Sequence, residues 1–463
     1  MKLIPIYAWN KTRKVFREKG SKLSNQPWFQ GALLLLCVVV ALLLANLPAT
    51  KEFYHNILNT ELTIKLASPN DAINVYFPKD MNVGKFINDI LMVIFFFTVG
   101  LEIKREVAYG ELSSPKKAML PVIAAFGGVI CPALIFTLVN HGGPGATGWG
   151  IPTATDIAFA VCILSALGDK VPVAMKVFLT ALAIADDLIA ILVVALFYGG
   201  AINGKLLLAA FLLIGLALLM RKLGEKRMFP YLVIALGIWI LFYYGGIHAT
   251  MSGVVMAFVI PNKSRYDKKE VYTRIQDSWD NFLKYDDIES GMGFPSGPQR
   301  HYLRVIKSTA NGSVNMSYTL ERALSPWVNY LIMPLFALAN AGVELDPSAL
   351  TAGGVGLGII LGLVIGKPVG ITLLSWICVK LGIGEKPQGT TWPMFLAVAC
   401  LGGIGFTMSI FVDTLSFGDQ IPAVTEQLRA TGKIAVLTGS VCAAIIGSAF
   451  VCLVNAIQKR SKK

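Results

Sequence analysis

Long apolar runs recur from Gly31 to the C-terminal part of the chain, and they constrain the fold more than any other feature. A run of about 17–25 apolar residues is long enough to cross a bilayer as a helix. The composition agrees, because only 15% of the 463 residues are charged, against about 25% in an average soluble domain. The runs lack the alternating pattern of a transmembrane β-barrel. The sequence therefore predicts an all-α polytopic membrane protein in a lipid bilayer.

We expect about twelve transmembrane helices in a single domain that covers residues 1–463. Numbered I to XII in chain order, they are expected at residues 31–47, 83–108, 118–139, 148–167, 171–198, 205–219, 230–244, 248–260, 327–343, 355–379, 392–412 and 434–456. The seven cysteines all fall in apolar segments, which is typical of buried small residues and not of a disulfide framework or a metal site.

Basic residues indicate which segments face the cytoplasm, because Lys and Arg concentrate on the side that is not translocated. The basic arm 1–30, the long polar segment 261–326 and the C-terminus are therefore expected inside, with both termini cytoplasmic. These segments explain the net charge of +13 without a nucleic-acid partner. Segment 261–326 is either partly disordered or a small ordered insertion.

The remaining long loops are expected on the outer face. Residues 48–82 form an external loop, where alternating residues on both sides of a turn cluster predict a small β-hairpin. The loop after helix XI is also expected outside, and it holds mixed charges: Asp413, Asp419, Glu426 and Arg429.

Asp186 and Asp187 stand side by side near the middle of expected helix V. A charged side chain at the bilayer centre costs about 2.5–3.5 kcal/mol on insertion scales. Packing gives no reason for one such residue, still less for two. The pair is therefore the main candidate for a functional site.

Three further polar features lie inside expected helices. In helix IV, Pro152 precedes Asp156 and favours a broken helix, although a helix that starts at Pro152 with Asp156 near the interface is the alternative. In helix X, Lys367 lies mid-helix before Pro368, where a snorkelling lysine is the alternative. In helix XI, the glycines and hydroxyls of Gly402–Ser409 indicate either unwinding or tight helix packing.

Taken together, these features predict an inverted repeat. Helices III–V and X–XII form two three-helix units of opposite orientation, each with an interrupted middle helix. In such repeats the interrupted helices IV and XI cross at the midplane of the membrane. The positive helix ends at the crossing need an anion and the negative ends need a cation, for which Asp156 and Lys367 are the candidates.

At these residues the sequence resembles the bacterial NhaA-type sodium/proton antiporters, whose inverted repeats are a known example of this arrangement. The matching motifs follow one another in family order over nearly the full length of the chain. They are Phe97–Glu106, Thr153–Phe159, Ala185–Asp187, Gly246–Thr250, Phe336–Gly342, Gly366–Gly370 and Gly403–Met408.

The resemblance implies a role for each candidate residue. Asp186 and Asp187 are the pair that binds the transported Na⁺ or the proton, and Lys367 pairs with Asp186. Thr155 and Asp156 belong to the helix-crossing assembly. The remaining candidates resemble the residues of a cytoplasmic pH-response cluster: Glu102, Arg105, Glu106 and Glu321.

The resemblance also implies an activity. The protein is expected to be a secondary active transporter of the bacterial inner membrane, without a cofactor, that exchanges cytoplasmic Na⁺ for external H⁺. Electrogenic transport, activation by pH, Li⁺ as a second substrate and a homodimer joined through the β-hairpin are further implications. Segment 261–326 is longer than expected for the family, and Tyr318, Arg322 and Ser325 surround Glu321 where relatives carry lysine and histidines.

Two other functions compete with transport by exchange. An intramembrane aspartyl protease also buries two aspartates, but it needs them on separate helices facing one water. Asp186 and Asp187 are instead neighbours, about 100° apart on one helix. A channel needs a continuous pore, and its sodium flux would not drive protons in the opposite direction.

Overall fold

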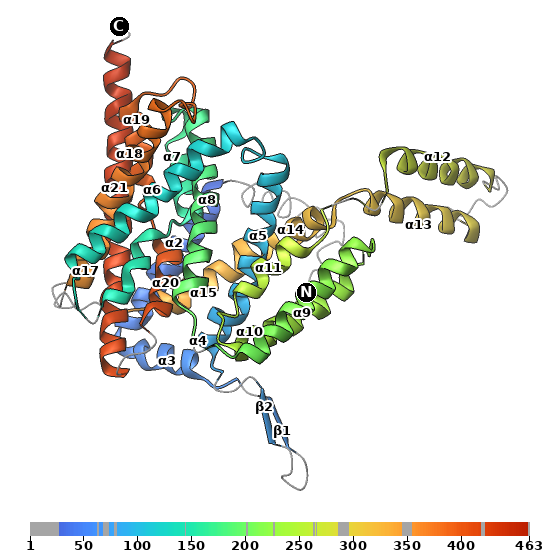
Figure 1. Ribbon diagram of the computed structural model, residues 1–463, viewed down its shortest axis with the longest axis horizontal. Helices are drawn as coiled ribbons and strands as arrows, with labels where there is room; N and C mark the ends of the chain where they lie inside the picture. Colours follow the sequence, from blue (N-terminus) through green and yellow to red (C-terminus); the bar gives the residue numbers. More distant parts are fainter. Residues whose placement is uncertain are drawn as a thin grey trace, which may run out of the picture. The chain divides into compact units, whose positions relative to one another are not determined.

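The computed structural model describes residues 27–461 except 63, 68–73, 78–80, 144, 201, 226, 263, 265, 286–295, 345–353 and 418–421. Nearly all of the described chain is helical (Figure 1). It divides into two compact units. The first unit comprises Met1–Phe95, Glu106–Gly200 and Trp327–Lys463, and the second comprises Phe96–Arg105 and Ala201–Pro326. The N-terminal basic arm up to residue 26 lies outside the described residues.

Nine helices within the described ranges are long and apolar enough to cross a membrane, and the count is ten if one bent pair forms a single span. The bent pair is α19 (Trp392–Leu401) and α20 (Phe406–Ser416). The other spans are α2 (Pro27–Asn46), α4 (Val83–Lys85) continued by α5 (Met92–Tyr109), α6 (Pro115–Val139), η2 (Ala146–Thr153) with α7 (Ile157–Ala166), α8 (Val173–Phe197), α9 (Gly204–Lys222), α10 (Met228–Gly245), α17 (Gly354–Leu361) continued by α18 (Lys367–Lys380), and α21 (Pro422–Ser461).

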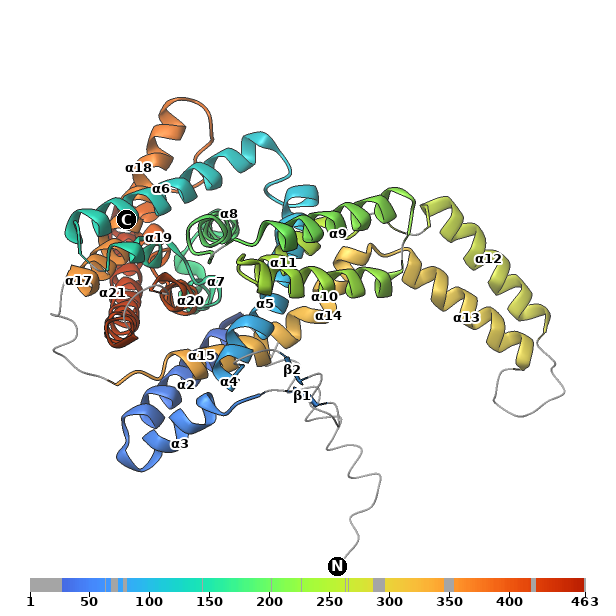
Figure 2. The same cartoon turned by 60° about the horizontal axis from the view of Figure 1, so that its bottom comes forward.

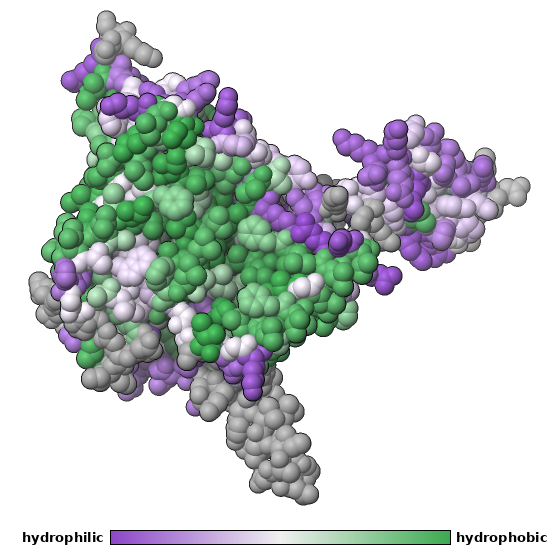
Figure 3. All heavy atoms as spheres, in the orientation of Figure 1, coloured by the Kyte–Doolittle hydropathy of each residue, from purple (hydrophilic) through white to green (hydrophobic). Residues whose placement is uncertain are grey.

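The segments predicted as helices VIII and IX are also helical in the structure. Helix VIII is α11 (Met251–Val259), which has only nine residues. Helix IX consists of α14 (Met316–Trp327), a π-helical turn (Val328–Ile332) and α15 (Met333–Asn340). The prediction of an all-α polytopic membrane protein is therefore confirmed. Many apolar side chains point outward, among them Leu138 (74% exposed) and Leu196 (76% exposed), as expected for contact with lipid (Figure 3).

Within the first unit, the two predicted three-helix groups pack against each other through helices III and X. The contact is between α6 and α18. It is close because Gly127 and Gly370 face each other, and a Cβ on either glycine would overlap the carbonyl of the other. In the second group, α17 of helix X and α19 of helix XI both pack against α21, so α21 connects these two helices (Figure 2).

Within the second unit, α9 and α10 pack side by side around a shared apolar cluster that includes Ala210, Tyr231 and Ile238. The described part of segment 261–326 is largely helical. It contains α12 (Lys268–Lys284) and α13 (Gly297–Gly312), which lie side by side (Figures 1 and 2). Ser296 starts α13 with a capping box, which satisfies backbone donors at the helix start. Figure 3 shows α12 and α13 covered by hydrophilic residues.

The external segment predicted at 48–82 begins with α3 (Pro48–Asn59). Two short strands follow, β1 (Ile64–Ala67) and β2 (Asn74–Phe77), which pair antiparallel with Ile64 opposite Phe77. The turn expected between them, residues 68–73, lies outside the described residues.

The expected loop after helix XI needs a correction. α20 continues through Asp413 to Ser416, and α21 already begins at Pro422, so Asp413, Glu426 and Arg429 all lie on helices. Asp413 is not solvated but 0% exposed, because α21 packs against α20 along these turns. Asp413 therefore belongs to a buried helix contact, whereas Glu426 is exposed on α21. Asp419 lies outside the described residues.

Candidate functional site

Helices IV and XI are both interrupted in the first unit. Helix IV stops at Thr153, directly after Pro152, and resumes at Ile157. Helix XI stops at Leu401 and resumes at Phe406 with a bend of 53°. Proline lacks a backbone donor, and glycines at 402, 403 and 405 remove the side chains that favour a regular helix. The prediction of two interrupted helices is confirmed.

The two breaks contact each other directly. The Asp156 backbone N–H donates to the carbonyl of Ile404 at 2.7 Å. The Thr155 hydroxyl donates to the carbonyl of Gly402 at 2.9 Å. The crossing chains thereby satisfy backbone groups that the broken helices leave without intrahelical partners. Asp156 is only 1% exposed, so it does not lie at an interface with water.

The Asp156 carboxylate holds the starts of two half-helices. One oxygen accepts the backbone N–H of Phe159 at 3.3 Å, which caps α7. The other oxygen accepts the backbone N–H of Thr407 at 3.1 Å and also its hydroxyl, at the start of α20. Both helix starts carry a partial positive charge, so one anion compensates both.

Asp186 and Asp187 lie on α8 and are 2% and 3% exposed. Lys367, the first residue of α18, is 0% exposed. Its Nζ lies 2.7 Å from a carboxylate oxygen of Asp186 and also donates to the hydroxyl of Thr155. Asp187 adds its charge to the surroundings of the ammonium. Lys367 therefore does not snorkel to an interface; it is a buried cation bound to Asp186 and to the crossing.

The start of α20 has an unusual backbone conformation. Phe406 has φ +26°, and within the described residues it is the only non-glycine residue with positive φ. Its backbone N–H donates to the hydroxyl of Ser440 on α21 at 3.1 Å, and its ring packs on Phe159 at 4.3 Å between centroids. Such strained residues persist where the surroundings hold them in place. Sequence reasoning missed Ser440, because nothing in α21 marks one serine as the partner of a distant backbone.

The predicted pH-response residues fall in both units. In the second unit, Arg105 forms an ion pair with Glu321, and its guanidinium lies 3.7 Å from Glu102. Glu321 is 6% exposed although it is charged. Glu106 belongs to the first unit, where its carboxylate accepts the backbone N–H of Glu111 at 3.2 Å.

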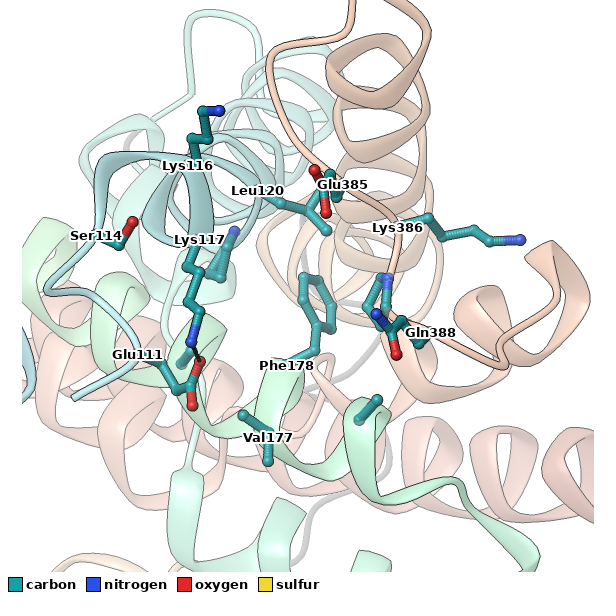
Figure 4. A pocket seen from close by; sticks show the side chains of 14 residues that line it. Glu111, Ser114, Lys116, Lys117, Leu120, Val177, Phe178, Glu385, Lys386 and Gln388 are labelled. Atoms are coloured by element: carbon teal, nitrogen blue, oxygen red, sulfur yellow. Dashed lines mark ion pairs between the residues drawn. The ribbon is translucent and has the colours of Figure 1, made fainter.

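Two cavities lie in the first unit near opposite ends of α6. One, of about 520 Å³, is lined by the start of α6, the first half of α8 and residues 385–388. In Figure 4, Phe178 of α8 lies between Lys117 on one side and Gln388 on the other. The lining of this cavity includes Ala181, which precedes Asp186 by five residues, or about 7.5 Å along α8. The other cavity, of about 460 Å³, is lined by residues 139–141, 143 and 145, the start of α17 and the first turns of α21.

A polytopic helical protein in which two interrupted helices cross next to a buried acid–lysine pair has the architecture of a secondary transporter. The family model described as Na⁺/H⁺ antiporter 1 matches residues 21–451. The chain therefore belongs to this family of multi-pass membrane transporters.

Individual relatives match over nearly their whole length. The chain is 39% identical over 435 residues to the Na(+)/H(+) antiporter NhaA of Wolinella succinogenes, covering 94% of this chain and 93% of the relative. It is 41% identical over 420 residues to the protein of the same name from Sulfurimonas denitrificans, covering 90% and 91%. Among solved structures, the sodium proton antiporter MjNhaP1 of Methanocaldococcus jannaschii matches with a TM-score of 0.41 and 14% identity over 91% of this chain and 97% of that one.

Proposed function

We propose that this protein exchanges cytoplasmic Na⁺ for external H⁺ and that Asp186 and Asp187 form the binding site shared by the two ions. One observation carries the proposal: two adjacent buried acids on α8 lie beside a single buried cation, Lys367. When both acids are ionised, two negative charges against one positive charge leave a net charge of −1. A monovalent cation or a proton neutralises that charge, and buried charges need such compensation.

The chemistry of the site suits sodium. Na⁺ is a hard cation, and carboxylate, hydroxyl and carbonyl oxygens suit hard cations. One oxygen of Asp186 bonds to Lys367, while the other is buried without a hydrogen-bond partner among the residues that the structure describes. A sodium ion at that oxygen would replace its missing partner. A proton on the same group would exclude the ion, so the two substrates compete for one site.

Competition becomes exchange when the site opens to each side in turn. The two cavities near opposite ends of α6 support this alternation, since the first extends along α8 toward the acidic pair. The crossing half-helices supply the moving part, because the repeats rock around a site fixed at their interface. The first cavity opens, on our topology, to the cytoplasm, and both termini lie on that side.

Further properties belong to the proposal on the strength of the family. We propose more than one proton per sodium ion and therefore electrogenic exchange, with Li⁺ as a second substrate. Activation by pH is assigned to Glu102, Arg105, Glu106 and Glu321. We also propose that the protein is a homodimer, joined through β1 and β2, in the bacterial inner membrane. The protease alternative is disfavoured because the two acids are sequence neighbours on one helix.

The experiment that tests the site uses Asp187→Asn. It keeps the side-chain shape but removes a charged ligand, so sodium-driven proton release from everted membrane vesicles should disappear while the protein still inserts. Asp169→Asn, at an exposed acid just before α8, is the matched control and should exchange normally. Exchange by Asp187→Asn at the rate of the control would refute the site. Sodium flux without opposite proton movement in the unaltered protein would favour a channel.

A further inference from the structure

A second buried acid on the broken helices, Asp413, takes no part in the site described above. It lies on α20, is 0% exposed, and neither carboxylate oxygen has a hydrogen-bond partner within the described ranges. It packs so tightly on α21 that a Cβ on Gly432 would overlap the carboxylate. A buried carboxylate without hydrogen bonds is costly to keep, so packing alone does not account for it.

The charged and titratable groups that face Asp413 come from two helices. Lys433 and Arg429, both half-buried on α21, exert their charges on it, but neither forms an ion pair with it in the part of the chain that the structure describes. Tyr198, at the end of α8, is the third group. The other elements packed against α20, η2 and α15, contain no titratable side chain.

Asp413 is the middle member of a buried polar stripe on α20. Ser409, Asp413 and Ser416 are spaced four and three residues apart, which places them on one face over about 10 Å. At one end, Ser416 interacts with the half-buried Tyr198. At the other end, the Ser409 hydroxyl donates to the carbonyl of Ala154 in the break of helix IV, at 3.5 Å. The stripe therefore connects the end of α8 with the helix crossing.

We propose that Asp413 is a proton-relay carboxylate that carries protons between the expected outer face and the helix crossing. The proposal rests on the proposed function. In one cycle the carboxylate accepts one proton from water at the Tyr198 end and becomes a carboxylic acid. It then gives one proton, through water, to a carboxylate of the Asp186–Asp187 pair and returns to its starting state. Lys433 and Arg429 stabilise the ionised form between the two transfers.

The simplest alternative is that Asp413 only balances the charges of Lys433 and Arg429. Two kinds of transport separate these roles. Exchange of external for internal sodium, followed with radioactive sodium at equal pH on both sides, moves no net proton and does not need a relay. Exchange of sodium for protons needs one. A structural role predicts equal losses in both assays, whereas a relay predicts a loss only in the second.

The test compares Asp413→Asn with Glu426→Gln, which removes an exposed charge from the same region of α21, in proteoliposomes of purified protein. For Asp413→Asn, the maximal rate of sodium-driven proton transport should fall at least about tenfold, since a positioned proton carrier contributes about 10²-fold or more. The half-saturating sodium concentration and the sodium-for-sodium exchange should match those of the control. Asp413→Glu should recover most of the proton transport.

Normal proton transport by Asp413→Asn, or an equal loss in both kinds of exchange, would overturn the relay. Should Asp413→Asn fail to fold, Asp413→Asn with Lys433→Gln restores the charge balance. If Asp413 is a relay, the double variant should fold but keep a low rate of sodium-driven proton transport. If Asp413 only balances charge, that rate should recover in the double variant. If the unaltered protein moves no protons upon sodium addition, the proposed function itself fails. This result differs from rapid sodium-driven proton transport by Asp413→Asn, which would refute only the relay.

Discussion

Replacing Lys367 by methionine removes the buried ammonium but keeps a side chain of similar length. The change leaves the Asp186 carboxylate, which bonded to Lys367 at 2.7 Å, without its cation in a site that is 2% exposed. Removing one partner of a buried ion pair costs about 3–5 kcal/mol, mostly because the other charge stays buried and uncompensated. The lost bond to Thr155 acts in the same direction.

Two comparisons separate the loss of the Lys367 charge from the loss of its packing. Lys380→Met removes an exposed lysine from the other end of α18, where charge contributes about 1 kcal/mol or less. Lys367→Met combined with Asp186→Asn removes both buried charges, and replacing a complete buried pair by neutral groups is often close to neutral for stability. The double variant should therefore be more stable than Lys367→Met, although it carries one more substitution.

The assay is unfolding of purified protein in mixed detergent micelles, with the free energy of unfolding measured at several pH values. The deficit of Lys367→Met should be smaller under acidic conditions, because a buried carboxylic acid, unlike a buried carboxylate, needs no cation. A Lys367→Met protein as stable as Lys380→Met at neutral pH would refute the reasoning. A double variant no more stable than Lys367→Met would show that the lost packing of Lys367 matters more than the charge.

Two further predictions concern the crossing and the long insertion. Thr407→Val removes the hydroxyl that donates to Asp156, so it should cost about 1–3 kcal/mol and slow exchange. Thr414→Val on the same helix removes a hydroxyl that donates to the carbonyl of Phe411, one turn away, and should have little effect in the same unfolding and vesicle assays. Deleting much of residues 266–307, a range that holds α12 and most of α13, should leave sodium-driven proton release measurable. Complete loss in a well-inserted protein would show that the insertion takes part in the mechanism.

Much of the membrane fold could be predicted because hydrocarbon makes local sequence informative. Apolar length defines a spanning helix, and a charge such as Lys367 within one must find a partner inside the protein. The breaks in helices IV and XI were indicated by Pro152, which lacks a backbone donor, and by the glycines at 402, 403 and 405, which destabilise a regular helix. These signals lie within a few residues of the features that they predict.

What the sequence could not provide depends on contacts between distant segments. Asp413 follows an apolar run, so its position looks like the end of a helix, whereas it is 0% exposed and packs against Gly432 of α21. The ion pair of Arg105 with Glu321 joins residues 216 positions apart, and no local pattern specifies it. The partner of the Phe406 backbone, Ser440, is hidden for the same reason.

The hydrogen bonds of the buried acids indicate which of them are able to exchange ligands. Asp156 uses one oxygen to cap α7 and the other for two donors at Thr407, so binding a cation there would break the starts of two half-helices. Asp186 commits one oxygen to Lys367, and its other oxygen has no hydrogen-bond partner among the residues described. A group that gives up no structural bond can lose and regain a proton or an ion without unfolding its surroundings. The unpaired oxygens therefore favour Asp186 and Asp413 as exchanging groups, and the bonds of Asp156 make it a permanent part of the crossing.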